Sequence, residues 1–586
     1  MPGRSEIAWV KPPAVLVAVA AVVACLGVGM TMIGSQSTGI STDEPGHVRR
    51  VNSYLGYGLY IRTFERERAT AGEIPVGAYV YGPMTSALQH DVNRTMGKET
   101  GYEAQFGQEQ YAVRHAVVAA MSILGLLAVV AIAWIILGDW GWGVVAGGIL
   151  AATPLWTGHA MFNPKDVPVA SAHTLLTAGL IWLALTQPAA KPWRVLAGGA
   201  AVAAGSTLML GTRPGMWPSL VASLVVFGVI LVRTRADQTR RNVLRLVGAV
   251  LASAAASYAA LVAVYPRVYS DVGAVLRQSV FSSAHYDGYG AQRRSDRFYV
   301  PVHLLTDLPV LVLLLTCGGT AVAVVVAVRP RRSIRADCLA LVGSQAFALM
   351  AAAVLFNSNL YQGLRQLLFA IPALAVLATV GVAALLTKVK PGPWRLAAIS
   401  VASAALVLPV AAQVAMFPYQ YAYMNLAAQA AGHVDQDGPD YFGTSFREYA
   451  QTGPQDVKIV CPFLRFGGTV KRNQEDCRTD PGTTLSPFWA EERPVPDRSQ
   501  HDEYYAILRS NRPTPPNCSP FRQVTRRVNL QEVVMSRMFR CHRTTESEKL
   551  VGQAMKRQER ARQGWMAGPD ATTWVPAAAP QLTPLR

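Results

Sequence analysis

The sequence predicts a polytopic α-helical membrane protein with about 11 transmembrane helices, followed by a small disulfide-stapled α+β domain. Of its 586 residues, 51% are hydrophobic and only 15% are charged, whereas soluble domains usually carry about 25% charged residues. The apolar residues gather into runs of roughly 20, the length that crosses a bilayer as a helix. Four of the seven cysteines follow the last run, and an even number there is typical of an oxidising compartment.

Eleven apolar runs are predicted to span the membrane. The first is too long, and too poor in a small-residue cleavage site, for a signal peptide, so we expect a retained helix. Backbone polar groups in lipid must be paired within their own segment, which makes each run a helix. The runs cover residues 13–34, 113–137, 141–158, 168–187, 195–211, 215–232, 246–265, 303–328, 337–356, 366–386 and 396–416.

Lys and Arg residues set the orientation of these helices. Cytoplasmic loops of membrane proteins carry an excess of both residue types, and long loops weigh less in this rule. With a cytoplasmic N-terminus, the short outer loops hold only Lys165, Arg213 and Arg365. An odd number of spans then places the C-terminal segment outside. The inner segments hold Arg4, Lys11, Lys191, Arg194, Arg233, Arg235, Arg240, Arg241, Arg245, Arg329, Arg331, Arg332, Arg335, Lys388, Lys390 and Arg395.

The net charge of +18 follows largely from this arrangement. Basic residues beside membrane helices fix orientation and attract anionic lipid. The sequence has no zinc-finger spacing, no Gly-rich phosphate-binding loop and no nucleic-acid-binding motif. We therefore expect membrane lipid as a partner and no nucleic acid.

Three regions follow from this pattern. Residues 1–416 form the membrane domain with two long outer loops, 35–112 and 266–302, and residues 417–545 form an extracytoplasmic α+β domain. Residues 546–586 are predicted to be a basic helix and a disordered Pro- and Ala-rich tail. The strings "VKIVCPFL", "DEYYAILRS" and "NLQEVVMSRMFRC" indicate strands or mixed elements of the outer domain. This domain holds the acceptor or acts as a structural lid; both alternatives stay open.

Four cysteines of the outer domain are predicted to form two disulfides. Three pairings are possible, and we favour the local one, which joins Cys461 to Cys477 and Cys518 to Cys541. A metal site is less favoured because no CxxC pair is present. The other cysteines, Cys25, Cys317 and Cys338, fall in apolar runs, where a thiol behaves as a small hydrophobe.

Unusual polar residues collect on the predicted outer side of the membrane. Asp43 and Glu44 follow the first span directly, and "FNPKD" turns at Pro164, which presents Lys165 and Asp166 at the surface. Polar residues at membrane depth are costly and tend to be functional or paired. The ordinary alternative is that each cation is an interfacial anchor whose head group reaches water. Arg213, before Pro214, and Arg365 have the same two interpretations.

An ordered set of strings distinguishes these interpretations. "TDEPGH", "GHAMFNPKDVPVA", "LYQGLRQLLFAIP" and "DYFGTSFRE" follow one another along residues 13–450. Together with the spans and the extracytoplasmic tail, they resemble the GT-C superfamily of glycosyltransferases. The resemblance is to the branch that contains protein O-mannosyltransferases and the bacterial aminoarabinose transferase that modifies lipid A. Residues after 450 match no family that we can name.

This resemblance implies an integral-membrane glycosyltransferase of the bacterial cytoplasmic membrane whose active site faces outward. The donor would be a sugar on a polyprenyl phosphate, and the acceptor a hydroxyl of a glycan, lipid or protein. By the family pattern Asp43 is the general base and Glu44 orients or hydrogen-bonds. A base near the attacking hydroxyl contributes about 10²–10⁴-fold to the rate. Fixed cations suit the departing phosphate, and the candidates are Lys165, Arg213 and Arg365.

Further residues are candidates for substrate binding. His47 and His159 would hydrogen-bond the phosphate or a sugar hydroxyl, or they are ordinary polar loop residues. Asp166 would assist the acceptor or merely neutralise Lys165. Arg293, Arg294 and Arg297 are reserve cations for the phosphate. Asp43 and Asp166 would be the ligands of a divalent metal, but this branch often needs none, so we expect no metal and no other cofactor.

Two rival functions belong to other classes. A transporter or flippase of lipid-linked sugars typically places its charges at the bilayer midplane and consists of two related halves. Here the charges gather on the outer face and no related halves are evident, which favours the enzyme. The second rival is an inactive scaffold for envelope assembly, and substitution of Asp43 distinguishes it from an enzyme.

Overall fold

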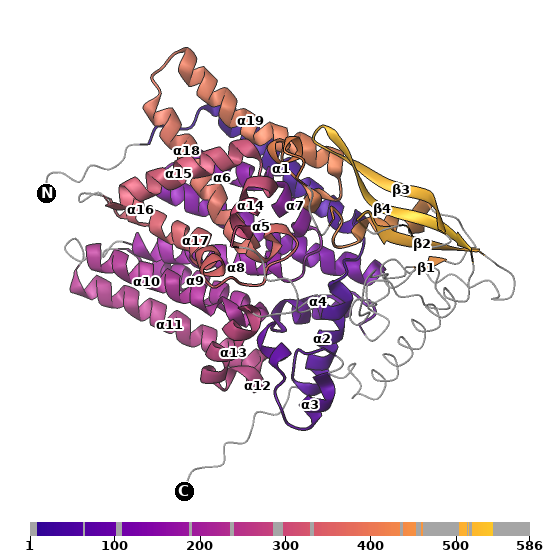
Figure 1. Cartoon of the computed structure of the whole chain (residues 1–586). Coiled ribbons are helices and arrows are strands. Elements are labelled where there is room, and N and C mark those ends of the chain that lie inside the picture. The colour runs from indigo at the N-terminus through magenta and orange to yellow at the C-terminus, as the bar shows by residue number, and fades with distance from the viewer. Residues whose placement is uncertain are drawn as a thin grey trace, which may run out of the picture.

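The computed structural model describes residues 9–62, 65–100, 108–186, 190–234, 239–284, 297–328, 333–433, 438–452, 459–460, 503–511, 514 and 518–542. Within these ranges, ten helices are long and apolar enough to cross a membrane, as Figure 1 shows for the bundle. The chain is thus a multi-pass helical membrane protein. The main helices of the ten spans, three of which include a preceding short segment, are α1 (Ala14–Ser37), α5 (Gln108–Leu137), α8 (Asp166–Ala184), α9 (Pro192–Thr212), α10 (Trp217–Thr234), α11 (Arg240–Val264), α15 (Val310–Val328), α17 (Leu339–Leu355), α18 (Ile371–Lys388) and α19 (Pro393–Met416).

The eleventh predicted span, 141–158, is not one continuous helix. It consists of α6 (Trp140–Ala151) and α7 (Pro154–Ala160), because Pro154 has no N–H to continue the ladder of α6. The side chain of Asp139 caps α6 by accepting the Gly141 N–H at 2.8 Å. Twelve residues extend only about 18 Å, less than the hydrocarbon core of about 30 Å. α6 is almost completely buried and packs against α1 and α5.

Two other predicted spans also begin with a separate short segment. Run 303–328 is split into α14 (Tyr299–Asp307) and α15 around Pro309, and run 366–386 consists of η6 (Gly363–Ala370) and α18. η4 (Pro214–Met216) and α16 (Ile334–Asp337) likewise lead into α10 and α17. These interruptions matter because η6 carries one of the predicted site cations.

α8 and α18 form the centre of the bundle and are almost entirely buried. α9 packs on α8, and α15 packs on α18 through small residues. A Cβ at Gly319 would lie 1.8 Å from the Leu377 carbonyl oxygen, and one at Gly381 would lie 2.2 Å from the Leu315 carbonyl oxygen. Such small residues allow membrane helices to approach closely. The outer helices expose apolar side chains, with Leu251, Leu314 and Leu396 64%, 61% and 67% exposed.

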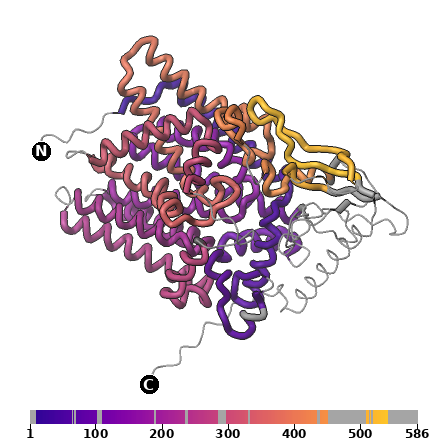
Figure 2. The backbone as a smooth tube through the Cα atoms, in the orientation of Figure 1, coloured from indigo at the N-terminus to yellow at the C-terminus, as the bar shows by residue number. Residues whose placement is uncertain are grey.

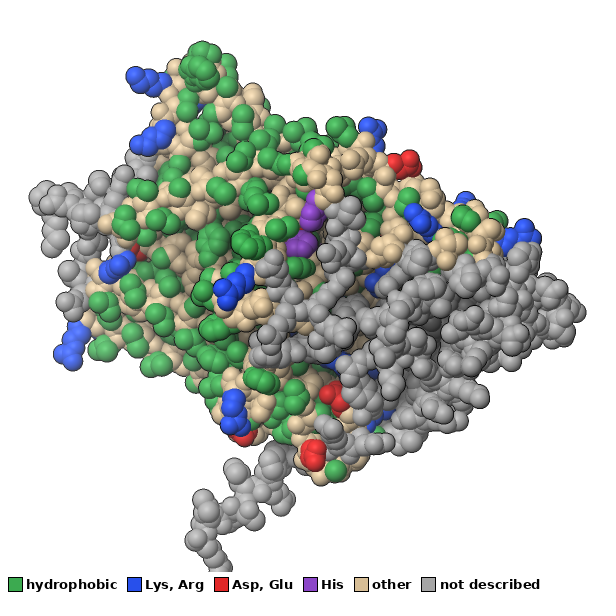
Figure 3. All heavy atoms as spheres, in the orientation of Figure 1, with side chains coloured by type: hydrophobic (Ala, Val, Ile, Leu, Met, Phe, Trp, Pro, Cys, Tyr) green, Lys and Arg blue, Asp and Glu red, His purple; other side chains and the backbone are tan. Residues whose placement is uncertain are grey.

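Figure 3 shows hydrophobic side chains spread over the helical part of this face, with Lys and Arg mostly toward its ends. The predicted long loops contain short helices of their own, which Figure 2 places at the same end of the bundle as the C-terminal sheet. These helices are α2 (Glu44–Tyr57), α3 (Arg66–Thr70), η2 (Val76–Tyr79), α4 (Met84–Thr95), α12 (Pro266–Tyr269) and α13 (Val272–Ala284).

After α19 the chain folds into the predicted α+β arrangement. Four short helical segments are followed by a four-stranded sheet of order β1-β2-β4-β3, in which only the β1–β2 pair is parallel. The segments are η7 (Gln420–Ala422), α20 (Leu426–Ala430), η8 (Thr444–Phe446) and α21 (Arg447–Thr452), and the strands are β1 (Ile459–Val460), β2 (Glu503–Arg509), β3 (Cys518–Val528) and β4 (Gln531–His542).

The sheet is fixed to these helical segments by Tyr449. The Tyr449 hydroxyl donates to the Ser536 carbonyl oxygen at 2.9 Å and accepts the Val524 N–H at 3.1 Å, which joins α21 to β4 and β3. Arg526 of β3 donates to the Phe417 carbonyl oxygen at 3.0 Å. The end of α19 and the sheet therefore pack as one unit.

The cysteine predictions are partly tested. Cys25, Cys317 and Cys338 are free thiols, the first two within α1 and α15 and Cys338 at the turn between α16 and α17. The Cα atoms of Cys518 and Cys541 lie opposite each other in the β3–β4 register, which agrees with the favoured local pairing; the disulfide itself stays a prediction. Cys461, Cys477 and the predicted helix and tail of 546–586 lie outside the described residues.

Candidate active site

Asp43 is held in a short turn between α1 and α2. It precedes Glu44, the first residue of α2, and Pro45 fits the first turn of a helix because its missing N–H is not needed there. The Thr42 N–H donates to the Phe442 carbonyl oxygen at 3.0 Å. The Ser41 N–H donates to Glu44 Oε2 at 2.7 Å. The turn is thus fixed both within itself and by the segment after α19.

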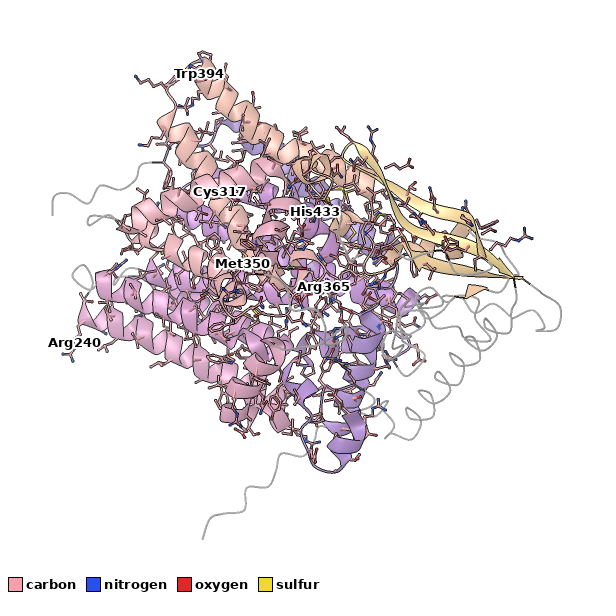
Figure 4. All side chains as sticks on the ribbon, viewed as in Figure 1. Arg240, Cys317, Met350, Arg365, Trp394 and His433 are labelled. Atoms are coloured by element: carbon pink, nitrogen blue, oxygen red, sulfur yellow. The ribbon has the colours of Figure 1, made fainter. Side chains whose placement is uncertain are left out.

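Asp43 forms ion pairs with two cations from distant parts of the chain. Lys165 Nζ lies 2.6 Å and Arg365 Nη1 lies 3.0 Å from the same atom, Asp43 Oδ2. The Arg365 side chain is only 1% exposed, whereas that of Asp43 is 21% exposed. The carboxylate therefore lies between buried positive charge and the outside. Figure 4 places Arg365 toward the sheet end of the bundle and Arg240 at the opposite end.

These ion pairs control the protonation of both partners. Burial alone would raise the pKa of the Asp43 carboxyl, but the charges of Lys165 and Arg365 outweigh it and hold the pKa well below its usual range. Burial alone would lower the pKa of Lys165, but the Asp43 carboxylate outweighs it and raises the pKa above its usual value. Asp43 is therefore ionised and Lys165 charged, and in this state the carboxylate is a weak base.

The "NPKD" turn between α7 and α8 positions Lys165. Asn163 Oδ1 accepts the backbone N–H groups of Lys165 at 3.3 Å and Asp166 at 3.0 Å, an Asx turn. The Asn163 amide nitrogen then faces Asp166 Oδ2 at 3.0 Å and His159 Nδ1 at 3.1 Å. His159 Nδ1 accepts that bond, so Nε2 carries the hydrogen and donates to the Tyr441 hydroxyl at 3.1 Å. His159 is thus a neutral buried residue that supports the turn.

Asp166 pairs with Arg213 rather than with Lys165. Arg213 Nη1 lies 3.0 Å from Asp166 Oδ1 and 3.4 Å from the Gln366 carbonyl oxygen, which links the end of α9 to the start of α8 and to η6. Asp166 is almost fully buried. The sequence offered two roles for Asp166, assistance to the acceptor or neutralisation of Lys165. In the structure the cation that pairs with Asp166 is Arg213.

Tyr81 connects the cations of the site and was not predicted. Its ring centroid lies 5.2 Å from Lys165 Nζ, 5.9 Å from the Arg213 guanidinium carbon and 4.9 Å from that of Arg50. Cations are attracted to the face of an aromatic ring at such distances. The string "YVYGP" is polar and aromatic, but no local signal indicates which cations its second Tyr contacts.

His47 packs edge-on against Tyr81 on the other side. Its Nδ1 lies 2.6 Å from the Tyr60 hydroxyl, which also lies 2.7 Å from Ser86 Oγ. Burial, followed by the charge of Lys165, lowers the pKa of His47 well below its usual value, so the ring is neutral. His47 therefore lies beside Tyr81, and its nearest partner is the hydroxyl of Tyr60.

Glu44 points away from the cations that hold Asp43. Its Oε1 lies 2.8 Å from His115 Nε2, and His115 Nδ1 lies 3.0 Å from the Ser35 carbonyl oxygen. A carbonyl oxygen only accepts, so Nδ1 carries a hydrogen, and one further proton must lie between Nε2 and Oε1. Glu44 and His115 thus form a buried unit with no net charge that ties α2 to α1 and α5. Both carboxylate oxygens of Glu44 thus have partners in the fold around the Asp43 turn.

Three candidate cations remain. Arg297 is exposed before α14, and Arg293 and Arg294 lie outside the described residues. Among the described residues, no group of three or more His, Cys, Asp or Glu side chains is placed to hold a metal ion. The structure therefore brings together Asp43, Lys165, Asp166, Arg213 and Arg365, with His47 and His159 beside them.

The fold and the site together define a multi-pass helical membrane protein with an ion-paired carboxylate at one end of its helix bundle. No protein-family model matches the chain, and no curated protein matches it. Among solved structures, the chain is similar to ArnT from Cupriavidus metallidurans bound to undecaprenyl phosphate, with 15% identity and a TM-score of 0.46 over 89% of this chain and 97% of that one. The apo form of the same protein is 13% identical to this chain, with a TM-score of 0.45 over 90% of this chain and 97% of that one.

Proposed function

We propose that this protein is an integral-membrane glycosyltransferase that moves a sugar from a polyprenyl-phosphate donor to an acceptor hydroxyl. The observation that carries the proposal is the sharing of Asp43 Oδ2 by Lys165 and Arg365. Two fixed cations that converge on one anionic oxygen form a site suited to an oxyanion, and Arg fits phosphate well. The motifs that resemble the GT-C glycosyltransferases supply these same residues.

In the proposed mechanism the donor phosphate replaces Asp43 as the partner of the two cations. Once released from them, the carboxylate recovers its basicity and takes the proton of the acceptor hydroxyl. The hydroxyl oxygen forms a bond to the anomeric carbon of the sugar, and the bond from that carbon to the phosphate oxygen breaks. Its electron pair stays on the phosphate, where Lys165 and Arg365 stabilise the added charge. Inversion at the anomeric carbon follows from this single displacement.

An apolar cavity beside Arg213 supports a lipid-linked donor. It has a volume of about 190 Å³ and lies among α9, α10, α11 and α13, and Pro214, which follows Arg213, forms part of its wall. Its lining is almost entirely apolar, with Leu220, Leu224 and Leu276 among the residues. A polyprenyl chain in this cavity would have its phosphate end near the cations.

The placement of the charges supports an outward-facing site in the bacterial cytoplasmic membrane. Lys165 precedes α8, Arg213 follows α9 and Arg365 precedes α18, so all three lie at helix ends on one side of the bundle. The start of α11 and the end of α18 lie on the other side, with Arg240 and Lys388 as their terminal residues. By the charge rule that other side is cytoplasmic. A transporter would instead place such charges at the midplane.

The proposed function is tested by complementation of a gene deletion. The deletion strain should accumulate a polyprenyl-phosphate sugar and lack one envelope glycan, both detected by mass spectrometry, and the wild-type gene should reverse both changes. Asp43→Asn should reverse neither, because the amide cannot accept the proton as a base does. Membrane levels and thermal unfolding of the variant protein serve as controls. Full complementation by Asp43→Asn would refute Asp43 as the base and favour the scaffold.

A further inference from the structure

The segment 440–443, which follows α20 and opens the outer domain, lies where the turns of the site meet. Phe442 in this segment is 2% exposed. Its carbonyl oxygen accepts the Thr42 N–H at 3.0 Å, in the turn before α2. Its ring lies edge-on against that of Phe162, with centroids 5.0 Å apart, in the turn between α7 and α8 that carries Lys165. One residue of the outer domain thus contacts both turns.

The same ring also lies against the guanidinium of Arg365. The Arg365 guanidinium carbon is 4.9 Å from the ring centroid of Phe442 and 5.0 Å from that of Tyr361. Cations are attracted to aromatic faces at such distances, and most strongly where water is excluded, as it is around a side chain that is only 1% exposed. Arg donates from a planar head on a long flexible stem. The two rings beside that head therefore restrict the direction in which Nη1 donates to Asp43 Oδ2.

The segment that carries the Phe442 ring is fixed by the carboxylate of Asp440, which is 1% exposed. This carboxylate accepts the backbone N–H groups of Thr444 at 3.1 Å and Ser445 at 3.0 Å, and the Ser445 hydroxyl also donates to it. Ser445 Oγ in turn lies 2.6 Å from Ser536 Oγ of β4. The segment is therefore held both within itself and by the sheet.

A second set of contacts joins the outer domain to the stretch between α1 and α2. Arg447 Nη1, at the start of α21, donates to the carbonyl oxygens of Gln36 at 2.6 Å and Thr38 at 2.8 Å. A Cβ at Gly39 would lie 2.2 Å from the Thr444 carbonyl oxygen, so the two stretches approach at a distance that glycine allows. The outer domain thus packs along the chain that leads into the acidic turn.

We propose that Phe442 and Tyr361 are positioning residues for the donor phosphate: their rings fix the direction in which Arg365 donates, and the outer domain holds the Phe442 ring in place. This inference rests on the proposed function, in which Arg365 binds that phosphate. It gives the outer domain a role besides acceptor binding and that of a structural lid. The ordinary alternative is that Phe442 merely fills space in the aromatic cluster with Phe162 and Tyr421. Only the positioning role acts through Arg365.

The test is a double-mutant cycle on the binding of undecaprenyl phosphate to the full-length protein in nanodiscs, measured by calorimetry. Phe442→Met replaces the ring by an apolar side chain of similar size that adapts to irregular space. It should weaken binding about tenfold in the wild-type background, the effect of a misdirected charged hydrogen bond. Arg365→Gln should itself weaken binding but leave Lys165 to hold the phosphate. In that background Phe442→Met should change the affinity less than about twofold, because the group on which the ring acts is gone.

An equal loss of affinity in the two backgrounds would show a packing role and would overturn the proposal. Calorimetry gives the stoichiometry as well as the affinity, so a smaller fraction of folded protein is not mistaken for weaker binding. Phe539→Met is the matched control, because Phe539 is as buried as Phe442 but packs with Leu508 within the sheet. It should lower the unfolding temperature and leave the affinity unchanged in both backgrounds.

A second variant keeps the proposal open to refutation if Phe442→Met does not fold. Tyr361→Leu removes the other ring beside Arg365 from a half-buried position, and its effect should likewise be confined to the background that keeps Arg365. Unchanged affinity, or an equal effect in both backgrounds, would overturn the inference alone. Failure of the proposed function gives a different pattern, since wild type itself would then not bind undecaprenyl phosphate, and both proposals would fall.

Discussion

The replacement of Glu44 by Gln separates a positioning role from a catalytic one. In the structure Glu44 accepts the Ser41 N–H at 2.7 Å and shares a proton with His115 Nε2 at 2.8 Å. Gln reproduces both bonds, because its carbonyl oxygen accepts from Ser41 and its amide donates to Nε2 of a neutral His115. The net charge of the unit is zero before and after the change. We therefore expect Glu44→Gln to keep the fold and most of the activity.

Glu44→Ala should behave very differently. It leaves the Ser41 N–H and Nε2 of the His115 imidazole buried without a partner, and each such group costs about 1–3 kcal/mol. The sum of about 2–6 kcal/mol is a large part of a typical stability of about 5–15 kcal/mol. The variant should therefore unfold at a clearly lower temperature, and the turn that holds Asp43 should loosen.

Two properties of each variant are compared with those of wild type: sugar transfer, measured by complementation, and the unfolding temperature of the purified protein. Glu109→Gln is a suitable control, because this carboxylate is 77% exposed and pairs only with Lys98 at 2.6 Å. It should affect neither readout. If Glu44→Gln abolished transfer while it kept the unfolding temperature of wild type, the charge of Glu44 would act on the substrate, and its assignment to His115 would be refuted.

Two further predictions follow from the contacts of the site. The pKa of Asp43 is depressed in the folded protein, so its ion pairs stabilise the fold above the unfolded pKa of about 3.9, and this stabilisation is lost on further acidification. The difference in unfolding temperature between wild type and Asp43→Asn should therefore shrink below about pH 4. A difference that stays constant with pH would contradict the ion pairs. Gly158→Ala should destabilise by about 1–3 kcal/mol, since its Cβ would lie 2.1 Å from the Tyr421 backbone nitrogen. Gly29→Ala, with nothing within 4 Å, is the control in a thermal melt, and equal effects of the two substitutions would refute the close approach of α7 to η7.

The sequence alone indicated the residues of the site better than their partners. Lys165 and Arg365 are visible as isolated cations in short outer loops, and the loop order brings them to one side of the membrane. The pairing of Asp43 with residues 122 and 322 positions away depends on how α8 and η6 pack. That packing is not encoded in any local pattern, so the ion pairs themselves were beyond prediction.

The residues that were missed fall into two groups. His115 lies in an otherwise apolar helix, where polar residues are costly, so this signal was available in the sequence. The contacts of Tyr81 gave no such signal. In the fold, the break in run 141–158 was visible in the sequence as Pro154. Strand β3 was not predicted, because it contains Pro520, which lies at an irregularity of the β3–β4 register.

The contact between the first outer turn and the segment after α19 has a consequence for biosynthesis. The Phe442 carbonyl oxygen accepts the Thr42 N–H, and the Tyr441 hydroxyl accepts from His159, so the turns that carry Asp43 and Lys165 are fixed by residues much further along the chain. A ribosome produces the first turn roughly 400 residues before these partners, which takes on the order of 20–80 s at bacterial rates. Throughout that interval the nascent chain carries Asp43 and Lys165 without these hydrogen-bond partners. The cluster around Asp43 is therefore held by all of these contacts only after Phe442 has been synthesised.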